Sequence, residues 1–167
     1  TIDNIEFMAS SFDLERMGWL EELGVRRHKV GTKVNSNKAL IGAMLGTGKE
    51  VLLSCQQKPH LDIFSTQAIK FLYCIPHYPT RLTEFNFSSV DFIDEFQGFS
   101  CHYPGIEPSL VAISRGAKII EVHLTFNRQD NRGPDHCVSL LPEELASSVN
   151  FARKYEAMLG INSTTNE

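Results

Sequence analysis

Short apolar runs alternate along this chain with segments of helical periodicity, and this alternation restricts the possible folds more than any other feature. Apolar runs typical of buried strands lie at residues 5–10, 25–30, 51–54, 69–74, 98–102 and 118–126. Helical patterns follow them at residues 12–23, 37–48, 62–68, 88–96, 107–116 and 142–159. These β-α units in series predict an α/β fold, and strands without strict polar alternation predict a parallel sheet.

Glycine marks the ends of the longer helical patterns. It stands at Gly24, Gly48, Gly98, Gly116 and Gly160. Because glycine readily adopts the left-handed conformation that closes a helix, these positions are predicted helix ends.

Two parallel architectures compete for such a series. A doubly wound sheet usually has a glycine-rich phosphate loop after its first strand, and "MASSFD" (8–13) is no such loop. A (β/α)8 barrel of the TIM type instead places polar residues at the C-terminal ends of its strands. Polar residues of this kind are Ser10, Lys29, Thr32, Ser54, Tyr73, His77, Ser100, His102, Glu121 and His123. The chain therefore predicts a barrel that is incomplete, with about six units where a full barrel has eight.

Composition narrows the class of protein. The net charge is −4 and acidic and basic residues are interspersed, which argues against nucleic-acid and membrane-surface partners. The four cysteines are widely spaced, which favours reduced thiols and a cytoplasmic location. We expect residues 1–160 to form the barrel domain and residues 161–167 to be a tail or the start of a linker.

Several segments of the chain resemble the sialic acid synthase (N-acetylneuraminate synthase) family. They are "FMASSFDLERMGWLEELGV", "HKVGT", "GTGKEVLLS", "FLYCIPHYPTRLTEFNFSSVDFI", "GFSCHYPGIEPSLVAISRGAKIIEVHLTF" and "GPDHCVSLLPEEL". The last is similar to the family pattern almost letter for letter. By this resemblance the chain begins at the third strand of the barrel, so that the first two β-α units and the C-terminal antifreeze-like domain are missing.

The resemblance implies an activity, a cofactor and partners. The family condenses phosphoenolpyruvate with an N-acylated amino sugar to a nonulosonic acid and releases phosphate. A divalent metal, commonly manganese, polarises the sugar aldehyde. Missing strands would leave sheet edges at residues 5–10 and 118–124, so we expect a homo- or hetero-oligomer that covers them.

The resemblance also implies an anion-binding set. Lys29 stands where the family has its phosphoenolpyruvate lysine, and Ser10, Thr32 and Ser54 match hydroxyls that contact the same ligand. A lysine at the inward end of a buried strand is costly without an anion, which favours this role. The alternative is a solvent-exposed lysine.

A second set lies further along the chain. His102 in "SCHYPG" matches one of two metal histidines, or else is a strand-end histidine that only makes hydrogen bonds. His123 in "EVHLT" is a catalytic candidate or a core histidine, and Ser100 is expected to bind substrate. In the 133–139 loop we expect Asp135 to bind substrate and His136 to take part in catalysis; the alternative is a structural anchor.

Other positions depart from the family pattern. Tyr73 replaces the other metal histidine, Cys101 replaces an aspartate and Val122 replaces a lysine. These departures leave two alternatives to an active synthase: a non-catalytic pseudo-synthase that assembles with a complete synthase, and a different phosphate-binding barrel. The synthase hypothesis requires Lys29 and His102 to point into one shared mouth of the barrel.

Overall fold

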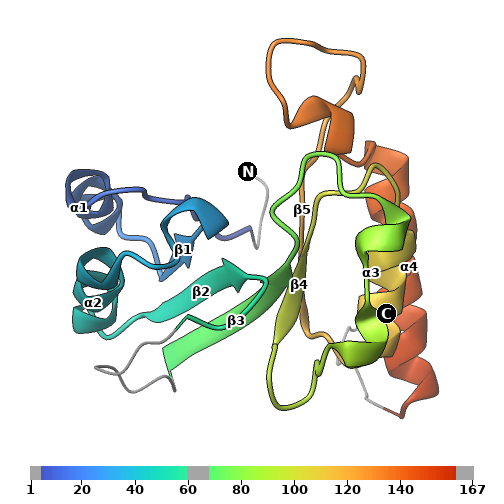
Figure 1. Ribbon diagram of the computed structural model, residues 1–167, viewed down its shortest axis with the longest axis horizontal. Helices are drawn as coiled ribbons and strands as arrows, with labels where there is room; N and C mark the ends of the chain where they lie inside the picture. The colour runs from blue at the N-terminus through green and yellow to red at the C-terminus, as the bar shows by residue number, and fades with distance from the viewer. Residues whose placement is uncertain (1–4, 60–67, 161–167) are drawn as a thin grey trace. The chain divides into compact units, whose positions relative to one another are not determined.

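Parallel strands and helices follow one another along the chain, and most of them are elements that the sequence predicts (Figure 1). The computed structural model describes residues 5–59 and 68–160. The chain divides into two units, residues 1–74 and residues 75–167. Each unit is described by itself below.

The first unit carries two helices and a parallel sheet. In chain order the elements are α1 (Leu14–Glu22), β1 (Arg27–Val30), the 3-10 helix η1 (Thr32–Val34), α2 (Lys38–Gly46), β2 (Glu50–Cys55) and β3 (Ile69–Cys74). Strand β2 pairs in parallel with β1 on one side and with β3 on the other. The parallel pairing brings the C-terminal ends of these strands to one edge of the sheet.

Local chemistry sets the boundaries of both helices. The carboxylate of Asp13 accepts a hydrogen bond from the backbone N–H of Arg16 at 2.8 Å, and Asn37 Oδ1 accepts one from Leu40 N–H at 3.1 Å. Such side chains satisfy N–H groups that a helix start leaves without partners. Both helices are followed by the predicted glycines, with φ of 72° at Gly24 and 75° at Gly48.

The core of the first unit lies between α2 and the sheet. Its fully buried side chains include Leu40, Ile41, Met44, Val51 and Leu53. Burial of each such side chain contributes roughly 1.5–3 kcal/mol, which fixes the face of β2 that α2 covers.

The imidazole of His28 is also fully buried in the first unit. His28 of β1 is 0% exposed, and its Nε2 lies 3.0 Å from Glu21 Oε1 and 3.4 Å from Thr47 Oγ1. Lys49 Nζ donates to the same Glu21 oxygen at 2.7 Å. Among the described residues, His28 Nδ1 has no hydrogen-bond partner. Burial lowers the pKa of His28 more than Glu21 raises it, so the imidazole is neutral.

The second unit combines short 3-10 turns with a strand pair and two helices. Its elements are η3 (Leu82–Glu84), η4 (Phe87–Ser89), β4 (Gly98–Cys101), α3 (Glu107–Ser114), β5 (Ile119–Val122), η5 (His136–Val138) and α4 (Pro142–Met158). Strands β4 and β5 are parallel, and α3 packs against both β4 and α4 (Figure 1). Phe99 of β4 is fully buried, and its ring packs edge to face against that of Phe87, with the two ring centroids 5.3 Å apart.

Two predicted elements are wrong. Residues 5–10 form no strand, because their backbone pairs with β1 at a single bridge, Ser10 with Lys29, and Ile5 and Phe7 are exposed. Residues 88–96 form no α-helix. Asp91 Oδ1 accepts from the N–H groups of Ile93 and Asp94, and local side-chain bonds of this kind compete with a helix.

The other predicted elements in the described part of the chain agree in type with the structure; most are shorter than predicted, whereas β3 has the predicted bounds and β2 is one residue longer at each end. The helix expected at residues 62–68 falls, except for its last residue, outside the described part of the chain. Gly98 begins β4 and ends no helix. In the described part of the chain, no helix has the length and apolar character needed to cross a membrane.

Candidate functional site

Lys29 and Ser54 lie together at the C-terminal ends of β1 and β2. Lys29 is 4% exposed, and its Nζ donates to Ser54 Oγ at 2.8 Å and to the carbonyl oxygen of Val30 at 3.0 Å. Strand pairing sets Lys29 opposite Leu52, so Ser54 lies two residues further along β2 on the same face of the sheet, where the long Lys29 side chain reaches it. An ammonium group held by a hydroxyl at such an edge is suited to a carboxylate or a phosphate.

The other two hydroxyls of the predicted anion-binding set lie on either side of Lys29 in the first unit. Ser10 makes a backbone bridge with Lys29, and its side chain is exposed. Thr32 begins η1, directly after β1, and is half-buried. Asn35 at the end of η1 donates from Nδ2 to the carbonyl oxygen of Ser54 at 3.2 Å, which ties the loop after β1 to β2. The structure therefore brings the side chains of Lys29 and Ser54 into direct contact. Ser10 is near Lys29 through its backbone bridge, and Thr32 is near Lys29 because it lies three residues further along the chain.

In the second unit, His102 follows β4 and both of its ring nitrogens have partners. Nδ1 lies 3.0 Å from the carbonyl oxygen of Ile75, and Nε2 lies 2.8 Å from the hydroxyl of Tyr78. A carbonyl oxygen only accepts, so Nδ1 carries the hydrogen. Burial lowers the pKa of His102 despite the opposing effect of the Ile75 carbonyl, so the ring is neutral and Nε2 accepts from Tyr78.

Tyr78 is the centre of a cluster of three rings, with His102 and His123. The Tyr78 and His102 rings stack with centroids 4.0 Å apart, and the Tyr78 hydroxyl also lies 3.4 Å from His123 Nε2. Tyr78 lies in the loop that follows β3. This loop is attached to the main chain of His102, because Thr80 N–H donates to the His102 carbonyl oxygen at 2.9 Å. We call Tyr78, His102 and His123 the Tyr–His–His cluster.

Asp135 reaches this cluster and His136 contacts a different residue. Asp135 Oδ1 lies 3.6 Å from His123 Nδ1, on an exposed loop. His136 Nδ1 lies 2.8 Å from Thr125 Oγ1, which itself donates to the carbonyl oxygen of Asn127 at 3.2 Å. Thr125 therefore accepts from His136, and this contact organises the loop.

The loop that carries Asp135 and His136 is anchored at its base. Arg128 donates from Nε to the Ser139 carbonyl oxygen at 2.8 Å and pairs with Glu144 of α4. Glu144 also accepts from Leu141 N–H at 2.8 Å. Ser139, which is buried, donates to the Asp135 carbonyl oxygen at 2.7 Å. These bonds fix the return of the loop to α4.

The side chains around His102 do not fit a divalent metal ion as they are arranged. Within residues 5–59 and 68–160, no three His, Cys, Asp or Glu side chains lie together as metal ligands do. Burial raises the pKa of Cys101, which stands where the resemblance implies an aspartate, so the thiol stays protonated. Burial also raises the pKa of Tyr73, at the other metal-histidine position. Manganese binding therefore stays a prediction.

Two further residues of the sequence prediction occupy other positions. Ser100 is buried within β4, two residues before His102. His77, one of the polar residues predicted at the strand ends, is mostly exposed, and its Nδ1 lies 2.7 Å from Glu84 Oε1. The sequence reasoning missed Tyr78 as a site residue, and its one signal was the Y-P-T motif in the loop after β3.

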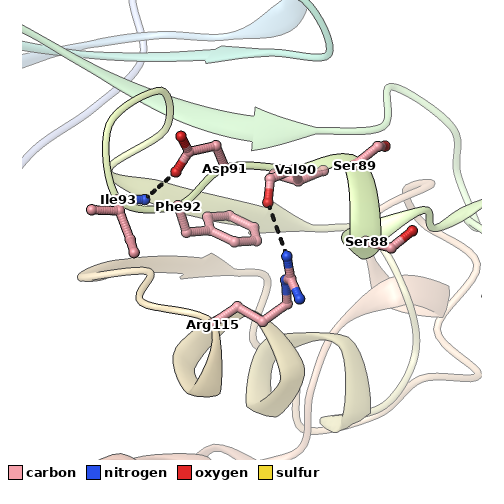
Figure 2. A pocket seen from close by; sticks show the side chains of 7 residues that line it. All are labelled: Ser88, Ser89, Val90, Asp91, Phe92, Ile93 and Arg115. Atoms are coloured by element: carbon pink, nitrogen blue, oxygen red, sulfur yellow. Dashed lines mark hydrogen bonds between the residues drawn. The ribbon is translucent and has the colours of Figure 1, made fainter.

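A separate pocket of about 240 Å³ lies where an α-helix was expected (Figure 2). It is lined by Ser88, Ser89, Val90, Asp91, Phe92, Ile93 and Arg115. Arg115 donates to the Val90 carbonyl oxygen at 3.4 Å, and Asp91 caps Ile93 N–H at 2.8 Å, as Figure 2 shows. No residue of the predicted site lines this pocket, and its charged groups stabilise the turn.

Comparisons with known proteins agree over nearly the whole chain. The model of the NeuB family matches residues 2–164. N,N'-diacetyllegionaminic acid synthase of Campylobacter jejuni is 30% identical, with 94% of this chain and 51% of that protein aligned. Human N-acetylneuraminate-9-phosphate synthase is 31% identical, with 93% of this chain and 47% of that protein aligned.

A solved structure agrees as well. The crystal structure of N-acetylneuraminic acid (sialic acid) synthetase from Leptospira borgpetersenii, in complex with citrate, superposes with a TM-score of 0.78 at 29% identity. The match covers 98% of this chain and 61% of that one. The chain spans about half the length of the curated relatives that it matches.

Proposed function

Because this chain belongs to the NeuB family, we propose that it takes part in the condensation of phosphoenolpyruvate with an N-acylated amino sugar to a nonulosonic acid. In this reaction the methylene carbon of phosphoenolpyruvate bonds to the aldehyde carbon of the sugar. One water molecule is consumed and inorganic phosphate leaves, so the atoms balance without a redox partner.

The pair formed by Lys29 and Ser54 is the observation that carries this proposal. Phosphoenolpyruvate brings a carboxylate and a phosphate, and both anions favour a buried ammonium group with a hydroxyl beside it. The 2.8 Å contact between Lys29 Nζ and Ser54 Oγ holds these groups ready at one strand edge. A preformed site of this kind does not have to be organised when the anion binds.

Binding and turnover test the proposal in two steps. Isothermal titration of the chain with phosphoenolpyruvate measures the anion site alone. Release of inorganic phosphate is then followed by ³¹P NMR with a panel of N-acylated hexosamines, with and without MnCl₂. Phosphate release that depends on one of these sugars supports the synthase, and the absence of both binding and release contradicts it.

A non-catalytic pseudo-synthase is the second candidate, and the departures from the family pattern at Tyr73 and Cys101 favour it. Tyr73 and Cys101 occupy positions where the resemblance implies a metal histidine and an aspartate, and burial keeps both side chains neutral. On this hypothesis the chain binds phosphoenolpyruvate and assembles with a complete synthase. Binding of phosphoenolpyruvate without phosphate release for any sugar, in a chain that forms an oligomer, is the result that distinguishes it.

A further inference from the structure

The Tyr–His–His cluster stands where the family resemblance implies a metal centre. We infer that Tyr78 withholds the His102 imidazole from divalent metal ions, so that His102 positions the tyrosine hydroxyl and does not act as a metal ligand. This inference depends on the proposed function in one respect, the choice of Mn²⁺ as the metal ion expected at this place.

The two nitrogens of His102 leave no lone pair for a metal in this arrangement. Nδ1 donates its hydrogen to the Ile75 carbonyl oxygen at 3.0 Å. The neutral ring then has a single lone pair, on Nε2, and that atom accepts the hydroxyl hydrogen of Tyr78 at 2.8 Å. Metal ions bind neutral imidazole through this same lone pair. A metal ion must therefore displace the Tyr78 hydroxyl before it can bind His102.

Packing makes this displacement costly. The Tyr78 and His102 rings stack at 4.0 Å with planes 30° apart, so the phenol cannot leave Nε2 without losing the ring contact. Two backbone bonds hold the loop, from Thr80 N–H to the His102 carbonyl oxygen at 2.9 Å and from His77 N–H to the Ile75 carbonyl oxygen at 2.9 Å. The hydroxyl is therefore directed at Nε2 by an anchored loop.

The neighbouring side chains do not form a ready set of metal ligands: although Asp135 Oδ1 lies 3.6 Å from His123 Nδ1, no three His, Cys, Asp or Glu side chains of the described residues lie together as metal ligands do. Cys101, directly before His102, is a buried thiol whose Sγ lies 3.8 Å from the Tyr103 carbonyl oxygen. His123 is a further imidazole in the cluster, with its ring centroid 5.5 Å from that of His102, and its Nε2 also faces the Tyr78 hydroxyl. The imidazoles of His102 and His123 thus converge on one phenol.

The test is a titration of the full chain with MnCl₂, in which electron paramagnetic resonance measures free Mn²⁺. We expect Tyr78→Phe to bind Mn²⁺ about fivefold more tightly than the wild type, because the lost hydrogen bond is a typical neutral one. The double variant Tyr78→Phe/His102→Ala should lose this gain. Tyr103→Phe, one residue from His102, is the matched control and should bind as the wild type does.

The other outcomes contradict the inference. If Tyr78→Phe leaves Mn²⁺ affinity unchanged or weakens it, the phenol does not compete with the metal. If neither the wild type nor Tyr78→Phe shows binding that depends on His102, the phenol is not what withholds the imidazole.

A second measurement needs no metal. Long-range ¹H–¹⁵N spectra of the labelled chain should show His102 as a neutral ring with hydrogen on Nδ1, and the Nε2 signal should shift in Tyr78→Phe. An Nε2 signal that does not move overturns the inference. Neither measurement uses phosphate release, so its failure is separate from failure of the proposed function.

Discussion

The two polar clusters at the strand ends differ in what they retain of the family pattern. The cluster of Lys29 and Ser54 keeps both side chains and brings them into direct contact. In the Tyr–His–His cluster, His102 stands where the resemblance implies a metal histidine, and the Tyr78 hydroxyl lies 2.8 Å from its Nε2. An anion site built on two adjacent strands needs one cation and one hydroxyl, whereas a metal site needs several ligands at once. The two-residue arrangement is therefore complete in this chain, whereas no set of three metal ligands is present among the described residues.

The largest expected effect concerns Lys29 and the first half of this comparison. Lys29→Met should weaken phosphoenolpyruvate binding about 10- to 100-fold, because a charged hydrogen bond contributes about 1.5–3 kcal/mol. Isothermal titration measures the change. Lys33→Met, an exposed lysine on η1, is the matched control and should bind as the wild type does. Equal binding by Lys29→Met and the wild type would mean that Lys29 and Ser54 do not form the phosphoenolpyruvate site.

The next effect compares the buried histidines of the two units, His28 and His102. Burial lowers the folded-state pKa of both below the unfolded value of 6.5. The unfolded chain therefore binds more protons below about pH 6.5, and stability that is present above this pH is lost as the pH falls toward the folded-state pKa. Each such histidine adds a slope of up to about 1.4 kcal/mol per pH unit.

Substitution separates the two contributions. His28→Gln should reduce the pH dependence of the unfolding free energy between pH 7.5 and 5.5. The pH dependence that remains should be the contribution of His102. Denaturant unfolding at several pH values measures the slope. His77→Gln, on a mostly exposed side chain, serves as the control. An unchanged slope in His28→Gln would mean that His28 takes up its proton in the folded chain.

A smaller effect sharpens the description of the anion site. Ser54→Ala should weaken phosphoenolpyruvate binding about fivefold, the effect of one neutral hydrogen bond. The bond from Asn35 goes to the backbone of Ser54 and survives the change. Titration against Ser36→Ala, an exposed serine in the neighbouring turn, is the measurement. A loss as large as that of Lys29→Met would mean that Ser54 is needed to place the ammonium group.

The smallest effect is expected at the rim of the Tyr–His–His cluster. Asp135 is exposed and lies 3.6 Å from His123, so Asp135→Asn should change the unfolding free energy by less than about 1 kcal/mol. Denaturant unfolding at neutral pH measures this. A larger loss would show that this contact, and not the bonds of Arg128 and Ser139, holds the loop.

Much of the fold was predictable because its signals are local. Helical spacing and the glycines after α1 and α2 predicted these helices, and the parallel order of the strands predicted the edge where Lys29 meets Ser54. Two predicted elements are wrong because the structure there depends on pairing with a distant strand or on side-chain hydrogen bonds that compete with a helix. Residues 5–10 are apolar enough for a strand, yet they pair with β1 at Ser10 alone. In the stretch before β4, Asp91 binds backbone groups that a helix would need.

The second half of the candidate site was harder to predict. The sequence marks His102 and His123 individually, but the contact with Tyr78 depends on how a loop 24 residues away in the chain returns to His102. No periodic pattern in the sequence predicts that this loop folds back onto His102. A tyrosine in a loop has no helical or strand pattern around it, so its role became visible only in three dimensions.

The attachment of the loop to His102 has one further consequence. Thr80 and Ile75 hold the residue through main-chain atoms, at its carbonyl oxygen and at Nδ1. These bonds do not depend on which side chain occupies position 78. A designer who replaces Tyr78 would therefore start from an imidazole that is already oriented, with one nitrogen open to a new partner of choice.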